Sequence, residues 1–295
     1  MEKDKGPCKG CPGKAMETKT KLQQLQAVEL DIFKEVVRIC EKYGLTYYMS
    51  AGTFLGAVRH KGFIPWDDDM DMRMPRPDYE KLLSVLPDEL REPFAARHFY
   101  HDRNVHRYFC RVENTKVRLH RNHTVHGQDS NAWIDIFPLD GMPENTLLAG
   151  CRKIHLLYRK MWMQLSVFDE IVDVKKKRAL PERIIVFLAL HTPIQKCLSW
   201  EKTWKKLDKA LKSYDVGKSK YYMNFMSAYK FRDIIPKAIY GKGAKYPFED
   251  QSFNGPEDYD AFLKILYGDY MKLPPEEKRK KHGLDDESIV IETDA

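Results

Sequence analysis

The chain has 295 residues, of which 43% are hydrophobic and 12% aromatic, and this composition excludes a largely disordered protein. Its first residues contain no apolar stretch, and its longest apolar run, residues 184–190, is much shorter than the roughly 20 residues of a spanning helix. Six scattered cysteines do not form a disulfide scaffold, so we expect a cytoplasmic protein with reduced thiols.

The net charge of +7 is distributed unevenly along the chain. Between Arg152 and Lys245, 22 Lys and Arg occur with 8 Asp and Glu, an excess of 14 positive charges. This pattern is typical of a surface that meets an anionic partner, and a set of solvated helix faces is the simpler alternative. Because the chain lacks zinc-finger spacing and RNA-binding aromatic motifs, we expect no nucleic acid, and favour an anionic membrane or a phosphate-rich polymer.

The first elements are predicted to be a tail, a long helix and a short strand followed by a short helix. Residues 1–20 are rich in Gly, Lys and Pro and are expected to form a flexible tail. Apolar residues recur at helical spacing over 21–43, and Gly44 stands where a C-cap glycine is expected. Residues 45–51 have the pattern of a strand and residues 53–62 that of a helix.

Strand patterns then alternate with helical ones. Methionines alternate with polar residues over 69–74, which predicts a strand, and Pro77 is expected to open the next helix. Further strands are predicted at 105–119 and 131–137. The pattern after Pro143 is mainly helical.

An acidic cluster follows the predicted helix at 53–62. Four aspartates occur within five positions, at Asp67, Asp68, Asp69 and Asp71. On a strand, Asp69 and Asp71 project from one face roughly 6–7 Å apart, Asp67 shares their parity and Asp68 points away. Such carboxylates can share one Mg²⁺ or Mn²⁺ or bracket two ions. The alternative is a hydrated acidic turn, which fits less well because the alternating methionines would bury one face of the segment.

A further carboxylate, Asp135, alternates with Ile134 and Ile136 in a predicted strand. An acidic residue in an apolar strand is costly unless it is paired or bound to a metal. We therefore predict Asp135 as a third metal ligand, with an ion pair to Arg111 as the alternative. Asp140, four residues after Ile136, is expected to cap a turn.

Candidate anion-binding residues precede the aspartates. Gly52 and Thr53 lie between a predicted strand and a predicted helix, where backbone N–H groups can approach a phosphate closely. Arg59, His60 and Lys61 form a cationic triplet that could neutralise a leaving diphosphate. A plain helix cap and ordinary surface charges are the alternatives for these two groups.

Aromatic residues also lie near these motifs in the sequence. Such rings could form a cage for a quaternary ammonium group, with core packing as the alternative. The candidates are Tyr47, Tyr48, Trp66, Tyr108 and Trp133.

The segment 49–79, MSAGTFLGAVRHKGFIPWDDDMDMRMPRPDY, resembles the LicD family of phosphocholine transferases. WIDIFPLDG at 133–141 and the ending from YPFED onward are similar to later motifs of that family, so the resemblance covers roughly residues 20–282. The family is similar to fukutin-type transferases and has a nucleotidyltransferase-like fold. That fold pairs a Gly-Ser/Thr turn with two carboxylates one residue apart and a third on a later strand.

The resemblance assigns these roles here to Gly52 and Thr53, to Asp69 with Asp71, and to Asp135. The turn carries Thr where many nucleotidyltransferases carry Ser. The implied fold class is α+β, with a nucleotidyltransferase-like mixed sheet and flanking helices. Residues 21–142 would form the catalytic core, and the mainly helical region 143–295 would pack on it and face the acceptor.

The resemblance implies metal-dependent transfer of phosphocholine, or a similar phosphate-linked group, from a CDP-activated donor. The acceptor would be a hydroxyl of a cell-surface glycan or teichoic acid precursor, free or lipid-linked, and CMP would be released. Asp67 or Asp69 would activate that hydroxyl. Peripheral contact with the inner face of an anionic membrane is expected. The alternatives are a true nucleotidyltransferase and a catalytically inactive binding module.

Overall fold

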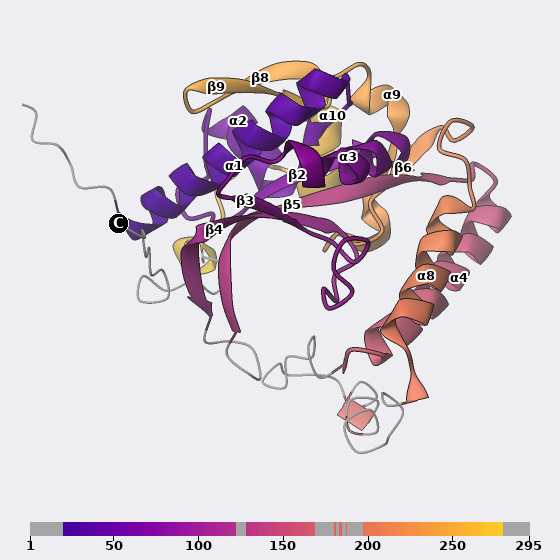
Figure 1. The fold of residues 1–295 in the computed structure, drawn as a ribbon. Helices are drawn as coiled ribbons and strands as arrows, with labels where there is room; N and C mark the ends of the chain where they lie inside the picture. The colour runs from indigo at the N-terminus through magenta and orange to yellow at the C-terminus, as the bar shows by residue number, and fades with distance from the viewer. Residues whose placement is uncertain are drawn as a thin grey trace, which may run out of the picture.

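The computed structural model describes residues 20–121, 128–168 and 197–279, with isolated positions at 180, 183, 184 and 187. The predicted tail and most of the apolar run 184–190 lie outside these residues. Figure 1 shows a curled sheet covered by helices on one side and a pair of helices, α4 and α8, that stands apart from it as an arm.

The main sheet has seven strands, and its central path runs β1-β2-β5-β4-β3, with β6 paired to β5 and β7 to β6. Strands β2 and β5 are parallel and the other pairs are antiparallel, so the sheet is mixed, as predicted. The strands are β1 Tyr48–Met49, β2 Met70–Pro75, β3 Phe94–Arg97, β4 Cys110–Arg121, β5 Gln128–Met142, β6 Tyr221–Met223 and β7 Ile234–Pro236.

Helix α1, the longest helix that the structure describes, confirms the prediction from its apolar spacing. Thr20 and Gln23 form a reciprocal capping box at its N-terminus, and Gly44 ends it in the left-handed conformation, with φ 63°. The helices are α1 Lys21–Tyr43, α2 Ala51–Arg59, α3 Arg76–Glu89, α4 Thr146–Leu165, α8 Trp200–Lys212, α9 Lys237–Tyr240 and α10 Tyr259–Tyr267, with 3-10 turns η1 Lys230–Asp233 and η2 Glu276–Lys278. None of the described helices is both long and apolar enough to cross a bilayer.

The largest hydrophobic core joins the two halves of the chain. The three alternating methionines of β2 are fully buried in it, as the sequence pattern indicated. The hairpin of β8 (Ala244–Phe248) and β9 (Gln251–Gly255) adds Phe248 and Phe253, and α10 adds Phe262. Because these late elements pack on α1 and α2, the N-terminal region does not bury its core alone.

The arm has a hydrophobic core of its own. Trp204 and Leu207 of α8 pack with Leu156 and Met163 of α4. The region after Pro143 thus contains helices, as predicted, and also β6 and β7, which were not. Each of these strands has three residues, too few for an alternating pattern to be recognised.

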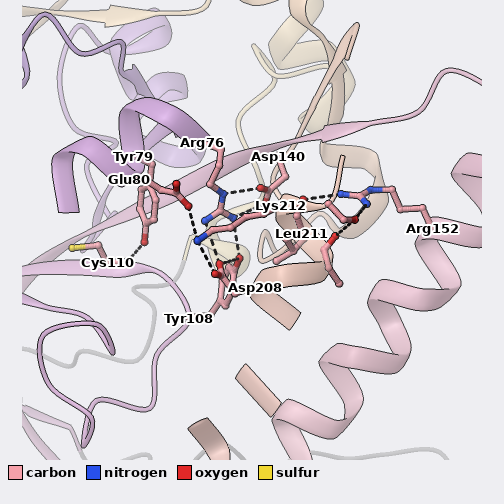
Figure 2. A network of polar contacts seen from close by, with 12 residues as sticks. Arg76, Tyr79, Glu80, Tyr108, Cys110, Asp140, Arg152, Asp208, Leu211 and Lys212 are labelled. Carbon is pink, nitrogen blue, oxygen red and sulfur yellow. Dashed lines mark hydrogen bonds and ion pairs between the residues drawn. The ribbon is translucent and has the colours of Figure 1, made fainter. Parts of the chain in front are cut away.

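A buried polar network fixes the arm to the sheet (Figure 2). Arg76 of α3 donates to both carboxylate oxygens of Asp140 at 2.7 Å, and Asp208 of α8 lies 3.6 Å from the same guanidinium group. The Tyr108 hydroxyl accepts a hydrogen bond from Arg76. The prediction of Asp140 as a turn cap was therefore wrong: β5 continues through this residue because it pairs there with Met223 of β6.

Candidate active site

The predicted catalytic aspartates gather at the junction of β2 and β5. These strands run parallel, with Asp71 directly opposite Asp135, so both side chains lie on one face of the sheet. Burial raises the pKa of Asp71 well above its ordinary value, and the carboxylates of Asp69, Asp135 and Asp67 raise it further. Residues 64 positions apart thus share one electrostatic environment.

Asp135 also forms the ion pair named as its alternative role. Arg111 donates from Nε and Nη2 to the two carboxylate oxygens of Asp135, at 2.8 and 3.0 Å. The guanidinium carbon of Arg111 lies 4.0 Å from the ring centroid of Trp133. Each oxygen of Asp135 still has a lone pair for a further ligand, so this pair orients the carboxylate without blocking it.

The beginning of α2 is shaped around Asp67. A Cβ at Gly52 would overlap with Oδ2 of Asp67, so any larger residue there would have to displace this carboxylate. Ala51 adopts a φ of 43°, a conformation rarely seen for a residue with a side chain, which marks local strain at this turn. Thr53 accepts a hydrogen bond from the backbone N–H of Asp71 at 2.8 Å. Its side chain therefore ties α2 to β2.

The cationic triplet lies at the other end of α2, about 12 Å from Gly52 at 1.5 Å per residue. Arg59 donates to the backbone oxygen of Tyr270 and to His60, and its pKa is lowered by burial, an effect that the charge of Asp67 opposes. Lys61 is exposed, and its backbone oxygen accepts a hydrogen bond from Glu249. Of the three, Arg59 and His60 are the partly buried ones.

A fifth acidic residue of the site, Glu29, was missed by the sequence analysis. It lies on α1, it is fully buried, and neither of its carboxylate oxygens has a hydrogen-bond partner in the part of the chain that the structure describes. One turn earlier, Gln26 donates to the backbone oxygen of Asp67 at 2.9 Å, which places this face of α1 against the aspartate loop. Burial raises the pKa of Glu29 well above its ordinary value, and the nearby aspartates add to this effect.

A signal for Glu29 existed in the sequence. Gln26 and Glu29 interrupt an otherwise apolar stripe of α1, with Leu25 and Ile32 on the same face. A polar pair on the buried face of a helix requires a partner elsewhere in the fold.

Two tyrosines beside the aspartates were also missed. The rings of Tyr229 and Tyr267 meet edge to face, with 5.3 Å between centroids. Burial raises the pKa of Tyr267 well above its ordinary value, and the charges of Tyr229, Asp67 and Asp71 contribute. Both tyrosines lie more than 150 residues after the acidic cluster, so no local pattern connects them to it.

The five aromatic residues proposed for a cage are spread over different parts of the fold. Tyr47, Tyr48 and Tyr108 are buried in hydrophobic cores, which was the alternative. Trp133 is covered by Arg111, and Trp66 lies 5.2 Å from the guanidinium of Arg279.

The side chains of the site are of the kind that binds a divalent cation. Carboxylate oxygens are the ligands that Mg²⁺ and Mn²⁺ prefer. The two oxygens of Glu29, which have no hydrogen-bond partner among the described residues, lie within a cluster of mutually repelling carboxylates. In the described residues, however, no three His, Cys, Asp or Glu side chains are already placed as a ligand set. The fit therefore rests on the type and charge of the groups.

Comparison with known proteins agrees with this geometry. Residues 44–147, which include all four aspartates of the β2–β5 junction, match the family model described as LicD/FKTN/FKRP, nucleotidyltransferase domain. The fold and the site thus define a nucleotidyltransferase-type domain. The chain is similar to the LicD family in this domain, as the resemblance of its motifs indicated.

Individual relatives support this assignment. The chain is 28% identical to the lipopolysaccharide cholinephosphotransferase LicD of Haemophilus influenzae over 288 residues, which cover 92% of this chain and 99% of that protein. A shorter match, 39% over 56 residues, relates it to the uncharacterized protein RP689 of Rickettsia prowazekii, covering 19% of this chain and 21% of that protein.

Proposed function

We propose that the protein transfers phosphocholine, or a similar phosphate-linked small group, from a CDP-activated donor to a hydroxyl of a cell-surface glycan precursor and releases CMP. The observation that carries this proposal is the gathering of Asp67, Asp69, Asp71 and Asp135 around the β2–β5 junction, next to the beginning of α2. The lipopolysaccharide cholinephosphotransferase of H. influenzae, related over nearly its whole length, supports the choice of transferred group.

We place Mg²⁺ or Mn²⁺ at Asp69, Asp71 and Asp135, with Glu29 as an additional carboxylate facing the ion. A cation bound there would neutralise the charge that develops on the donor diphosphate. Arg111 would keep the Asp135 carboxylate oriented by its bidentate hydrogen bonds. Thr53 would hold the position of Asp71 through the backbone N–H of that residue.

The remaining groups account for the transfer itself. The N–H groups at the beginning of α2, where Gly52 leaves the backbone accessible, would bind a donor phosphate. The acceptor oxygen forms a bond to phosphorus as the bond to the CMP oxygen breaks, and Asp67 or Asp69 would take the hydroxyl proton. Arg59, within the electrostatic range of Asp67, would offset negative charge on the departing CMP.

The acceptor belongs to the same proposal. A lipid-linked glycan, including a teichoic acid precursor, would be met at the cytoplasmic face of the membrane, which the protein would contact peripherally. The excess of 14 positive charges over residues 152–245 supports an anionic acceptor or surface, because the donor alone requires only a few cations.

A true nucleotidyltransferase is the second candidate, and the description of the matched domain favours it. Labelled CDP-choline with Mg²⁺ and a glycan acceptor distinguishes the two. Release of CMP with phosphocholine on the acceptor supports the first proposal, and release of phosphocholine with CMP on the acceptor supports the second. If neither product forms with any glycan tested while CDP-choline still binds, the protein is a binding module.

A further inference from the structure

Helix α4 exposes apolar residues on the side turned away from α8. Its buried side, with Leu156 and Met163, packs against α8. On the opposite side, Leu147, Ile154 and Met161 have exposed fractions of 75%, 70% and 45%. We call this set, completed by two further side chains that are each 50% exposed, the α4 stripe: Leu147, Ile154, Leu157, Tyr158 and Met161.

The spacing of the stripe shows that it is one continuous face. Intervals of seven, three, one and three residues keep these side chains within about a third of the helix circumference. A helix at a protein surface normally presents polar residues to water, whereas α4 carries apolar residues on its exposed side as well as on its buried side. An exposed apolar face of this kind indicates contact with another surface.

The arm that carries the stripe is strongly basic. Its two helices contain nine Lys and Arg and two acidic residues, a net charge of +7. The four basic residues of α4 lie along both borders of its buried side, so they flank the stripe at a distance. They are Arg152, Lys153, Arg159 and Lys160.

We propose that α4 docks on an anionic lipid bilayer, with the α4 stripe among the lipid chains and the positive charge of the arm attracted to the headgroups. Apolar side chains on one face and Lys and Arg on the other are typical of helices that lie in a membrane interface. Tyr158 and the partly exposed Trp162, whose ring centroids lie 6.1 Å apart, add aromatic groups of the kind enriched at that depth.

Charge selects the lipid surface over a second copy of the chain. Pairing two arms through their stripes would bring together two helix pairs with a charge of +7 each, at an electrostatic cost. An anionic surface instead attracts such an arm, with a strength that depends on salt.

Docking would also orient the candidate active site, because the arm is fixed to the rest of the protein (Figure 2). Asp208 of α8 lies 3.6 Å from the buried Arg76 of α3, and within the arm Arg152 of α4 donates to the backbone oxygen of Leu211 of α8 at 2.8 Å. That this orientation helps the site to reach a lipid-borne acceptor rests on the proposed function. The docking of α4 on the bilayer does not depend on that function.

The test is co-sedimentation of the full chain with phosphatidylcholine vesicles that contain or lack phosphatidylglycerol, across a salt series. The stripe variant is Ile154→Ser/Leu157→Ser/Met161→Ser, and the matched control, Met271→Ser/Leu273→Ser, changes two exposed apolar residues outside the arm. We expect the wild type and the control to bind anionic vesicles alike, and the stripe variant to bind at least about tenfold more weakly. Thermal melts should show that all three proteins are folded.

Three results would overturn the proposal. The wild type could fail to bind anionic vesicles, the stripe variant could bind them like the wild type, or the control could lose as much vesicle binding as the stripe variant. A wild-type dimer that the stripe variant cannot form, seen by sedimentation velocity without vesicle binding, would assign the stripe to a second copy. CMP release from CDP-choline with a water-soluble acceptor should be unchanged in the stripe variant. Failure of docking and failure of the proposed chemistry are therefore distinguishable.

Discussion

Replacement of Glu29 by Gln should stabilise the metal-free protein. Glu29 is fully buried, its oxygens have no hydrogen-bond partner among the described residues, and the aspartates lie close by. Its pKa in the folded state is raised above its ordinary value, so Glu29 favours folding only while it is protonated. The penalty therefore grows as pH rises above the ordinary pKa, until the raised pKa is reached.

The size of the effect can be bounded. Keeping a carboxyl group of ordinary pKa 4.5 protonated at pH 7 costs about 3 kcal/mol, since each pKa unit is about 1.4 kcal/mol. Glutamine has the same shape and no charge, although its amide would also lack partners, which costs about 1–3 kcal/mol. We expect Glu29→Gln to gain up to about 2 kcal/mol at neutral pH, or up to several degrees in Tm.

Glu35 provides a matched control on the same helix. It is also buried, but it accepts two hydrogen bonds from Arg38 at 2.8 Å, and one from the backbone N–H of Arg91. The hydrogen bonds from Arg38 lower its pKa below the ordinary value, so its stabilisation is present above that value and is lost as pH falls through the lowered pKa. Glu35→Gln should therefore destabilise the protein, by about 1 kcal/mol.

The assay is thermal unfolding in EDTA at several pH values between about 5 and 8. The gain from Glu29→Gln should be larger at the alkaline end, whereas the loss from Glu35→Gln should stay nearly constant, because this whole range lies above the ordinary pKa of Glu35. Added Mg²⁺ should raise the Tm of the wild type more than that of Glu29→Gln, because binding to the folded state stabilises by mass action. A Glu29→Gln protein that is less stable than the wild type in EDTA would refute our account of this carboxylate.

Three further predictions concern the candidate active site. Asp71→Asn should abolish CMP release and leave the metal-free fold intact, because it removes repulsion between carboxylates. Asp68→Asn should reduce CMP release less. Kinetics and thermal melts on both variants check this. Asp135→Ala should weaken Mg²⁺ binding measured by calorimetry, and Arg111→Ala should not, since it removes a cation and no ligand. Tyr267→Ala should raise KM for CDP-choline several-fold and Tyr267→Phe should not, if the ring contacts the quaternary ammonium; equal effects would point to the hydroxyl instead.

Features set by short stretches of sequence were predictable. The alternating methionines of β2 identified both the strand and its buried face, whereas Asp69, which precedes the strand, was placed beside Asp71 only as a prediction from the same alternation. Asp135 could be selected because a carboxylate between two isoleucines requires a partner. Each inference needed fewer than ten consecutive residues, over which helical and strand periods can be distinguished.

The remaining features depend on contacts between distant segments. In the sequence, Glu29 looks like an ordinary polar residue of an amphipathic helix. Its role depends on the packing of α1 against the aspartate loop, which lies about 40 residues later in the chain. Asp140 was assigned to a turn because Pro138 and Gly141 are common in turns, yet pairing with β6, about 80 residues away, extends the strand. Local propensity was overridden by tertiary pairing, as it commonly is in sheets.

The charge balance of the site constrains how it can bind its donor. Two arginines on the strands of the site are already paired, Arg111 with Asp135 and the buried Arg73 with Asp233, at 2.8 and 2.9 Å. These pairs hold the strands in place, yet the carboxylates of Asp69, Asp135 and Asp67 still raise the pKa of Asp71, in addition to the larger effect of its burial. Without a cation, these carboxylates would repel the diphosphate of a CDP-linked donor and weaken its binding. A divalent cation should therefore bind before the donor or together with it, and nucleotide titrations in EDTA should show much weaker binding than titrations with Mg²⁺.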